Sequence, residues 1–347
     1  MKPKLYLLTH SFPFARSETF LESEVPVLAE KFDIVFVPAE IEGEQRTIPT
    51  NSSIDDSLSK KFEISTRKRR SLLNPKTWAA LLSDLTKHRL NIGAMRRVNS
   101  FMSDALATYD WFLSIPTNEP AIAYTYWMTG KTQGLIWARQ HRPSLRVVTR
   151  AHRFDLYDDQ YQPAFWPLRQ RTIDGVDRLF VISDHGKEFL ENKYRTNSRI
   201  VISRLGAIDP QIRSSRSTDG VLRIVSCSSF LPQKRIQMMA KLIVGFALKN
   251  PQKQVSWQHF GDGPHREEVL NYLAKYSPPN LTSQFPGSVP NQTVVAHYKS
   301  QPVDVFVNLS DSEGIPVSIM EAQACGIPVI ATDVGGVAEI INNDNGY

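Results

Sequence analysis

Cysteine is scarce in this sequence of 347 residues, since only Cys227 and Cys325 are present. Two cysteines cannot build a disulfide framework, and because both lie in apolar segments we expect buried thiols in the reducing cytoplasm. Long apolar runs are also lacking, and none approaches the roughly 20 residues that a membrane-spanning helix needs. The first residues, MKPKLYLLTHSFPF, carry no small-residue cleavage pattern, so we predict a first strand there rather than a signal peptide.

The net charge of +6 is modest but unevenly spread. Between Lys60 and Arg97 the sequence has eleven Lys or Arg residues against only Glu63 and Asp84. Such a local excess is typical of a segment that meets an anionic partner, for example phosphate or a lipid surface. Neither a binding motif nor an aromatic stacking surface accompanies it, so a nucleic-acid partner is not expected.

Short apolar runs alternate with helical patterns along nearly the whole chain, which predicts parallel sheets with crossover helices. The chain is long enough for two cores, and residues 209–220, DPQIRSSRSTDG, are polar and turn-rich, as in a linker. We therefore predict two doubly wound α/β domains, 1–208 and 209–347, the second with few elements after its last strand, as if its C-terminal end were short. The predicted strands are Lys4–Thr9, Asp33–Pro38, Ala121–Tyr126, Arg146–Arg150, Arg178–Ser183, Arg199–Arg204, Leu222–Cys227, Gln254–Phe260, Asp304–Leu309 and Pro328–Thr332.

A pair of carboxylates marks the stretch DSEGIPVSIMEA, residues 311–322. Glu313 lies in a loop beside Gly314 after a predicted strand, and Glu321 follows eight positions later on a helix for which Pro316 suits the first turn. Ligands of α/β sheets bind at the carboxyl ends of the strands. Because an ionised carboxylate only accepts hydrogen bonds, the pair favours a hydroxyl-rich partner such as a sugar or a ribose. The alternative is that Glu321 merely stabilises the start of the helix.

Three further strand–helix junctions belong to the same predicted sheet and should converge on one edge of it. They are the Gly261-Asp262-Gly263 turn in HFGDGPHREEV, Gly335 and Gly336 in TDVGGVAEI, and Lys234 and Arg235 in SSFLPQKRI. Glycine lets the backbone approach a ligand and helix amino ends attract anions, so these junctions suit a phosphate group. For the basic pair, the alternative is a solvated helix start.

In the first domain, polar residues follow two of the predicted strands. RAHRFDLYD places His152 and Asp155 just past a strand, and THSFPFARSETFLESEV offers Ser11, Arg16, Ser17 and Glu18 after the first strand. A lone histidine is more often structural than catalytic. Its position at the ligand edge of the sheet nevertheless makes His152 a candidate.

The spacings that are typical of metal and dinucleotide sites are absent. The sequence has no H-E-x-x-H, no C-x-x-C and no D-x-D triplet that could hold Mg²⁺ against a diphosphate. It also lacks G-x-G-x-x-G, so we expect neither a metal nor a dinucleotide cofactor. If a diphosphate leaves in this protein, Lys234, Arg235 and helix dipoles must stabilise its charge instead.

Taken together, these motifs resemble the retaining glycosyltransferases of family 4, which have the two-domain GT-B fold. The resemblance is strongest over residues 222–347, through DVFVNLSDSEGIPVSIMEAQACGIPVIATDVGGVAEII. It extends more loosely over the first domain through SETFLESEV, YTYWMTGK, RAHRFDLYD, VISDHGKEFL and VISRLGAIDP. In these details the chain is similar to bacterial transferases of exopolysaccharide and lipopolysaccharide assembly.

The resemblance implies a role for each matching position. Glu313 would face the donor sugar, Glu321 the nucleotide ribose and Lys234 the diphosphate, while His152 would lie near the transferred sugar. The remaining donor-binding positions would be Gly314, Ile315, Pro316, Gly261, Asp262, Gly263, Gly335 and Gly336. The first domain would bind the acceptor, with Ser11, Arg16, Ser17, Glu18 and Asp155 on that side.

The sequence departs from the family at the phosphate-binding segment. Ser228-Ser229-Phe230 stands where the family usually reads Gly-Arg-Leu, so the usual arginine is absent at Ser229. Arg235 follows Lys234 where the family usually has glycine. We expect Arg235 to replace the missing guanidinium.

The predicted function is transfer of a sugar from a nucleotide sugar to an acceptor hydroxyl with retained anomeric configuration, without a metal. The acceptor would be a polysaccharide or a lipid-linked glycan. Two alternatives stay open, because fold does not fix function. One is a nucleotide-sugar epimerase or a phosphorylase on the same fold, and the other is a non-catalytic nucleotide-sugar-binding protein.

Residues 67–90, RKRRSLLNPKTWAALLSDLTKHRL, allow two interpretations. Trp78, Leu81, Leu82 and Leu85 recur at helical spacing and form one apolar face. An ordinary helix would bury this face on its own domain. An interfacial helix would instead dock the first domain on the anionic inner face of the plasma membrane, with Arg67–Arg70 beside it, each nearby basic residue contributing about 1 kcal/mol.

Overall fold

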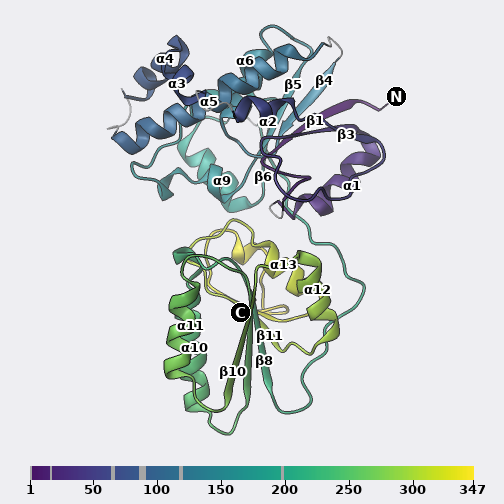
Figure 1. The fold of residues 1–347 in the computed structure, drawn as a ribbon, viewed down its shortest axis with the longest axis vertical. Helices are drawn as coiled ribbons and strands as arrows, with labels where there is room; N and C mark the ends of the chain where they lie inside the picture. The colour runs from purple at the N-terminus through teal and green to yellow at the C-terminus, as the bar shows by residue number, and fades with distance from the viewer. Residues whose placement is uncertain (1, 16–17, 64–66, 86–90, 117–119, 197–198) are drawn as a thin grey trace. The chain divides into compact units, whose positions relative to one another are not determined.

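The computed structural model describes the chain except for residues 1, 16–17, 64–66, 86–90, 117–119 and 197–198 (Figure 1). The chain divides into two compact units, Met1–Arg204 and Leu205–Tyr347. This division falls four residues before the position that the sequence suggested, 208/209. Each unit is an α/β structure built on its own parallel sheet.

The N-terminal unit contains a seven-stranded sheet in the order β3-β2-β1-β4-β5-β6-β7. Its strands are β1 (Lys4–Thr9), β2 (Asp33–Pro38), β3 (Ser52–Ile54), β4 (Ala121–Thr125), β5 (Arg146–Ala151), β6 (Arg178–Val181) and β7 (Ile200–Ile202). Every pairing is parallel; Lys4 of β1, for example, lies opposite both Asp33 and Ala121. Parallel pairing brings the carboxyl ends of all these strands, and the loops that follow them, to one edge of the sheet.

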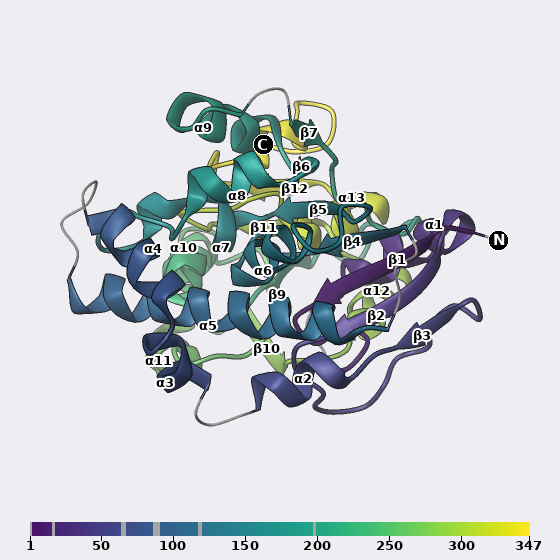
Figure 2. The same ribbon diagram turned by 90° about the horizontal axis from the view of Figure 1, so that it is seen from above.

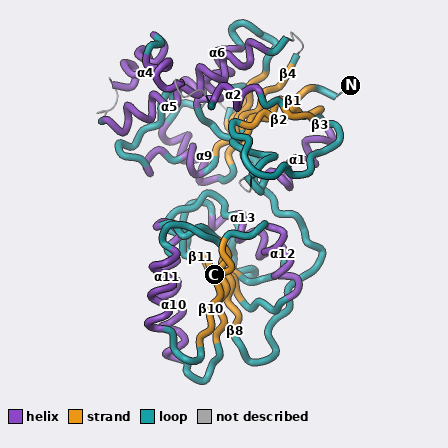
Figure 3. Tube along the Cα trace, in the orientation of Figure 1, coloured by secondary structure: helices purple, strands orange, loops and turns teal. Residues whose placement is uncertain are grey.

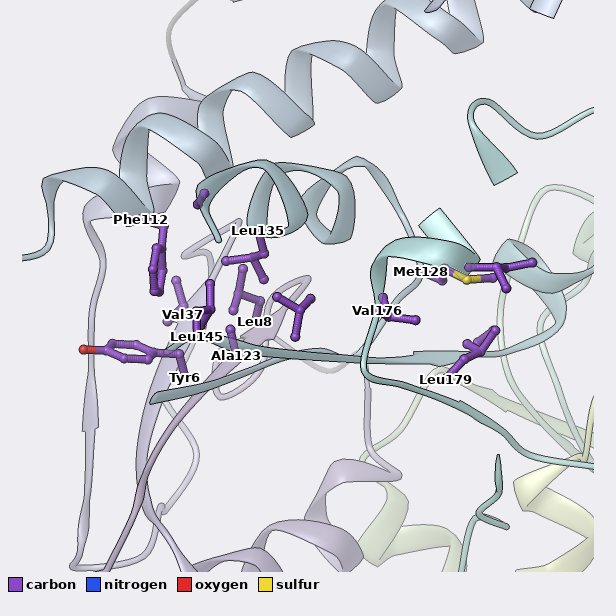
Figure 4. Packing of buried hydrophobic residues seen from close by; sticks show 14 of the residues in the cluster. Tyr6, Leu8, Val37, Phe112, Ala123, Met128, Leu135, Leu145, Val176 and Leu179 are labelled. Atoms are coloured by element: carbon purple, nitrogen blue, oxygen red, sulfur yellow. The ribbon is translucent and has the colours of Figure 1, made fainter. Parts of the chain in front are cut away.

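The helices of this unit cover both faces of the sheet. They are α1 (Leu21–Lys31), α2 (Ser57–Phe62), α3 (Arg67–Leu72), α4 (Pro75–Leu85), α5 (Ile92–Ser114), α6 (Gly130–Ala138), α7 (Arg153–Leu156), α8 (Arg169–Gly175) and α9 (Asp184–Lys193), with a 3₁₀ turn at Asp158–Gln160. Side chains of a strand alternate between its two faces. Tyr6 and Leu8 therefore pack in one cluster with Phe112 of α5 (Figure 4), whereas Leu5 and Leu7 pack on the other face with α1.

Helices α5 and α6 lie side by side (Figure 2). Two glycines of α6 allow this close contact: a Cβ at Gly130 would lie 2.0 Å from the Phe101 carbonyl oxygen, and one at Gly134 would lie 2.3 Å from that of Ala105. The start of α6 is thereby fixed against the middle of α5, next to the end of β4.

The C-terminal unit has a five-stranded parallel sheet in the order β10-β9-β8-β11-β12. Its strands are β8 (Leu222–Cys227), β9 (Val255–Phe260), β10 (Leu281–Gly287), β11 (Val305–Asn308) and β12 (Val329–Ala331). Its helices are α10 (Ile236–Lys249), α11 (Arg266–Tyr276), α12 (Asn291–Ser300) and α13 (Val317–Ala324), with 3₁₀ turns at Pro232–Lys234 and Val337–Glu339. Helices α10 and α11 cover one face of the sheet and α12 and α13 the other (Figure 3), each pair over its own apolar cluster.

Two strands were not predicted. β3 has only three residues, and β10 reads LTSQFPG, with polar residues and a proline where a buried strand would be apolar. The segment 209–220 has no helix or strand, as predicted, but it is hydrogen-bonded to the C-terminal unit. Ser214 N donates to the Cys325 carbonyl at 2.7 Å, and Ser217 N donates to the Asp304 carboxylate at 2.9 Å. No helix in the described part of the chain is both long and apolar enough to cross a bilayer.

Candidate functional site

The loop after β11 brings Glu313 into contact with Lys234. Lys234 Nζ lies 2.5 Å from Glu313 Oε1, and Asn308 Nδ2, at the end of β11, lies 3.4 Å from the same oxygen. Lys234 closes the 3₁₀ turn that follows β8, the neighbour of β11 in the sheet. The Glu313 side chain is only 7% exposed. Two residues from separate predicted motifs thus form an almost buried ion pair at the carboxyl edge of the sheet.

Gly335 and Gly336 hold the backbone of the Glu313 loop. A Cβ on Gly335 would lie 2.0 Å from the Glu313 carbonyl oxygen, and its φ of +58° is one that other residues rarely adopt. Gly336 N donates to the Gly314 carbonyl at 2.9 Å. Gly314, Ile315 and Pro316 are buried. The double glycine after β12 therefore sets the position of Glu313.

Glu321 lies on α13 at the same edge of the sheet. Asn291 Nδ2 donates to Glu321 Oε1 at 2.7 Å. Burial, and then the charge of Glu321, raises the pKa of Cys227, the last residue of β8, to about 12. Pro316 precedes the helix as its N-cap rather than lying in the first turn, because α13 begins at Val317.

The Gly261–Pro264 turn after β9 is packed on the segment that contains Ser229. A Cβ on Gly261, where φ is +143°, would lie 1.9 Å from the Ser228 carbonyl oxygen. Phe230 N donates to the Asp262 carbonyl at 3.0 Å, and Gly263 also lies against Phe230. The turn and the Ser228–Phe230 segment, which differs from the usual family sequence, are thus packed together. The Asp262 side chain is exposed.

Arg235 has a partner within this edge. Its Nε lies 3.8 Å from Asp311 Oδ2, and both side chains are about 40% exposed. The residue adopts φ +49°, which separates the 3₁₀ turn from α10. Its proposed replacement of the arginine missing at Ser229 stays a prediction.

In the N-terminal unit, His152 is enclosed by aromatic rings. The ring centroids of Trp127, Tyr126 and Phe20 lie 4.4, 5.1 and 5.5 Å from that of His152, which is 5% exposed. Neither ring nitrogen makes a full hydrogen bond with a described residue, although the ring lies toward Asp155 N as one half of a capping box at the start of α7. Burial, and then the Arg150 charge, lowers the pKa of His152 well below its usual value. The imidazole is therefore neutral, and at least one of its nitrogens has no partner among the described residues.

Asp155 is fully buried and binds the backbone. Its carboxylate accepts hydrogen bonds from His152 N at 2.6 Å and from Met128 N at 2.5 Å. Burial is the largest influence and raises the pKa of Asp155 to about 7. This side chain joins the loops that follow β4 and β5 and so orients His152.

Glu18 has a similar role in the loop after β1. Its two oxygens accept from the backbone N–H groups of His10, Ser11 and Phe12 at 2.8–3.0 Å and from Trp127 Nε1 at 2.6 Å. Ser11 is buried. Arg16 and Ser17 lie outside the described residues.

A cavity of about 1010 Å³ lies in the N-terminal unit at the carboxyl edge of its sheet. It is lined from the loops after β1, β2, β4 and β5 and from the middle of α5, which α6 holds in place. Of the predicted acceptor-side residues that the structure describes, Glu18 alone lines it, whereas Phe154, Tyr161 and Trp166 were not predicted. The aromatic density of FDLYDDQYQPAFW was the available signal.

Comparison with known proteins supports the predicted family. Residues 208–347 match the family model described as glycosyl transferases group 1. The putative colanic acid biosynthesis glycosyltransferase WcaL of Escherichia coli K12 is 24% identical over 205 residues, which is 57% of this chain and 50% of that protein. The chain thus spans about half the length of this curated relative.

Solved structures extend the similarity over the first unit. The lipopolysaccharide outer core galactosyltransferase WaaB has a TM-score of 0.63 at 14% identity, covering 99% of this chain and 85% of WaaB. A mutant of S. aureus TarM, in complex with Fondaparinux, alpha-GlcNAc-glycerol and UDP, has a TM-score of 0.68 at 11% identity, covering 100% of this chain and 89% of TarM. The chain therefore has the GT-B fold, and its residues 208–347 match the model of the glycosyl transferases group 1 family.

Proposed function

We propose that this protein transfers a sugar from a nucleotide sugar to a hydroxyl group of a glycan, with retention of the anomeric configuration. The observation that carries the proposal is the ion pair between Lys234 and Glu313, which the glycine turns around it hold at the ligand edge of a group 1 domain. The names of WcaL and WaaB, which refer to colanic acid and lipopolysaccharide, support a polysaccharide or lipid-linked acceptor.

The residues at the carboxyl edge of the C-terminal unit's sheet would bind different parts of the donor. Lys234 and Arg235 would bind the diphosphate, Glu321 the ribose hydroxyls and Glu313 the donor sugar. Carboxylates suit the two polyols because they only accept hydrogen bonds, and Gly261, Gly263, Gly335 and Gly336 let the backbone approach the nucleotide. The UDP bound to TarM supports a nucleoside diphosphate as the leaving group.

In the proposed reaction, the bond between the anomeric carbon and the diphosphate oxygen breaks, and a bond to the acceptor oxygen forms on the same face of the sugar. The departing oxygen takes the proton of the acceptor hydroxyl. Lys234 would stabilise the negative charge that develops on this oxygen. Neutral His152 would hydrogen-bond a hydroxyl of the transferred sugar through a ring nitrogen that no described residue binds.

Thermal-shift measurements with UDP, GDP and ADP should first identify the nucleotide, since a ligand that binds only the folded state raises the unfolding midpoint. The matching nucleotide sugar is then incubated with octyl glycosides, and the anomeric configuration of the product is read by NMR. An α-configured donor should give an α-configured product, also in EDTA, because Lys234 and Arg235 would replace the metal. Sugar conversion without any acceptor would favour an epimerase, and binding without any conversion would favour a non-catalytic protein.

We also propose that the first unit docks on an anionic membrane surface through α3 and α4. Trp78 and Leu82, two residues of the predicted apolar face, are 52% and 62% exposed, whereas the same helix buries Thr77 and Ala80 instead. Lys68 and Arg70 are exposed beside them. Leu81 and Leu85 have no described side-chain position. Exposed apolar groups next to basic ones favour the interfacial helix over the ordinary one.

A further inference from the structure

We propose that the cavity of the N-terminal unit binds an uncharged sugar of the acceptor and excludes anionic sugars and phosphates. The proposal rests on the glycosyl transfer proposed above and specifies the class of acceptor. It follows from two features of the cavity wall, its aromatic cluster and its charge.

Phe154, Tyr161 and Trp166 form the aromatic cluster. The Phe154 and Trp166 rings meet edge to face, with centroids 5.7 Å apart and planes at 89°, and Tyr161 lies 5.7 Å from Trp166. Phe154 is 54% exposed although it is a large apolar side chain. An exposed ring that lines a cavity is suited to pack against the C–H face of a sugar.

Trp166 also leaves a polar group without a partner. The residue is 8% exposed, and its indole Nε1 has no hydrogen-bond partner among the described residues. A buried N–H group without an acceptor costs free energy, so such groups are rare and call for an explanation. A sugar hydroxyl is an acceptor that this group could use after a small movement of the ring.

The charged groups of the wall are mostly carboxylates. Among the described residues, five carboxylates, Glu18, Glu40, Glu42, Glu63 and Asp104, line the cavity together with two permanent cations, Arg97 and Lys131. His10 also lines the wall and lies 3.4 Å from Glu40.

Both cations already have partners in the protein. Lys131 Nζ donates to the Thr9 carbonyl at 2.7 Å. Arg97 Nη1 donates to the Phe165 carbonyl at 2.8 Å, and its guanidinium lies 4.3 Å from the centre of the Tyr161 ring. An anion would therefore meet an excess of negative charge, whereas sugar hydroxyls can donate to the exposed carboxylates of Glu40, Glu42 and Glu63.

The test uses the full chain and saturation-transfer NMR without a donor. The neutral probes are methyl α-D-glucopyranoside, methyl α-D-galactopyranoside and methyl α-D-mannopyranoside, and the anionic probes are methyl α-D-glucuronide and glucose 6-phosphate. At least one neutral probe should bind, roughly tenfold more tightly than either anion, which corresponds to about 1.4 kcal/mol. Equal binding of neutral and anionic sugars, or no binding of any neutral probe, would overturn the proposal.

Two variants, each with a control, test whether this binding takes place in the cavity. Phe154→Ala should weaken the neutral probe at least about fivefold, since it removes the exposed ring, whereas Phe246→Ala, at a comparably exposed ring on α10, should leave it unchanged. Glu42→Gln together with Glu63→Gln should raise the affinity for the glucuronide, and Glu30→Gln outside the cavity should not. Unchanged probe binding in the Phe154 variant would contradict the assignment.

The nucleotide-induced thermal shift separates this proposal from the proposed function. Phe154→Ala should keep the full shift while it loses acceptor binding. If the wild-type protein binds neutral sugars in the cavity but transfers no sugar, the proposed glycosyl transfer is wrong and the proposed sugar site stands. If sugar is transferred and the acceptor KM of the Phe154 variant equals that of the wild type, the proposed sugar site is wrong and the proposed glycosyl transfer stands.

Discussion

Lys234 carries two of the proposed roles at once, because it pairs with Glu313 and would also bind the diphosphate. An ammonium that is held 2.5 Å from a carboxylate has less attraction left for a phosphate. In the proposed function the pair would couple the two roles, because the donor would compete with Glu313 for Lys234. If the diphosphate bound Lys234, Glu313 would be free to bind the sugar.

Glu313→Gln should therefore tighten the binding of the nucleoside diphosphate while it reduces turnover. We expect Kd to fall roughly three- to tenfold, by the loss of the competing charge, and kcat to fall at least about a hundredfold. Calorimetric titration and initial rates measure the two effects. Glu267→Gln, at an exposed carboxylate of α11, is the control. Weaker nucleotide binding in the Glu313 variant would show that the pair persists in the complex.

His259 makes the stability of the C-terminal unit sensitive to acid. The ring is fully buried, with Nδ1 2.8 Å from Ser226 Oγ and Nε2 3.0 Å from the Ser228 carbonyl oxygen, and burial lowers its pKa from 6.5 to about 4. The unfolded chain takes up this proton first as the pH falls, so stability is lost between about pH 6.5 and pH 4.

Compared with His259→Gln, the wild type should lose roughly 2 kcal/mol more of its unfolding free energy between pH 7 and pH 4.5. Urea denaturation at the two pH values measures this difference. His265→Gln, at an exposed histidine, should behave as the wild type does. An identical pH dependence in the His259 and His265 variants would contradict the assignment.

At the scale of elements, the junction after β12 is held by a glycine that no other residue can replace. Gly335→Ala places a methyl group within 2.0 Å of the Glu313 carbonyl oxygen at φ +58°. We expect a loss of at least about 2 kcal/mol of unfolding free energy and weaker nucleotide binding, because the Glu313 loop must move. Denaturant titration measures the unfolding free energy, and the nucleotide-induced thermal shift measures the binding.

Gly245→Ala is the matched control, since a Cβ there would meet no atom of the described residues within 4 Å. Gly245 lies inside α10, where alanine should stabilise the protein by about 0.5–1 kcal/mol. If both glycine substitutions destabilised the protein alike, steric contact at Gly335 would not be the cause.

The strands that the sequence could predict are those with mostly apolar runs, including the edge strands β7 and β12. β1, β2 and β8 have the predicted bounds because each is a continuous apolar run between turn signals. β10 lies at the edge of its sheet, with alternate residues exposed, so it carries no such run. Residues 209–220 were correctly predicted to lack regular structure, but their bonds to Asp304 and Cys325 depend on residues about 90 to 110 positions away, which local pattern cannot reveal.

At the candidate site, too, local sequence pattern predicts positions along the chain but not contacts between distant residues. Glycines and charges that follow strands locate the donor edge, because parallel strands must end together. The cavity of the first unit is lined instead by residues from α5 and from loops whose approach depends on the packing of α6 at Gly130. Phe154 could be placed after a strand, but its exposure beside Trp166 could not be predicted.

At the scale of the whole molecule, the basic segment should bring the chain to a membrane that carries its acceptor. Liposomes rich in phosphatidylglycerol should bind the protein at low salt and release it at high salt, because surface attraction falls off within a Debye length. Changing Arg67, Lys68, Arg69 and Arg70 together to Ser should reduce binding at least about tenfold. Sedimentation with liposomes measures the bound fraction of the protein.

The control removes four cations of the other unit, Arg216, Lys241, Lys249 and Lys275, by the same change to Ser. It keeps the total charge equal to that of the first variant. Binding that drops equally in both variants would indicate attraction by net charge alone, and binding that resists salt would indicate apolar insertion without a basic surface.

The Glu18 carboxylate holds the loop after β1 in place by filling a group of converging backbone N–H donors. The N–H groups of His10, Ser11 and Phe12 converge on it, and converging backbone N–H groups are a common receptor for phosphate. The chain thus carries an anion receptor that one of its own side chains permanently occupies. Loss of this carboxylate would vacate the receptor at the wall of the cavity. Replacing Glu18 by a residue without a carboxylate would therefore be expected to let phosphate bind at the cavity that is proposed to exclude it.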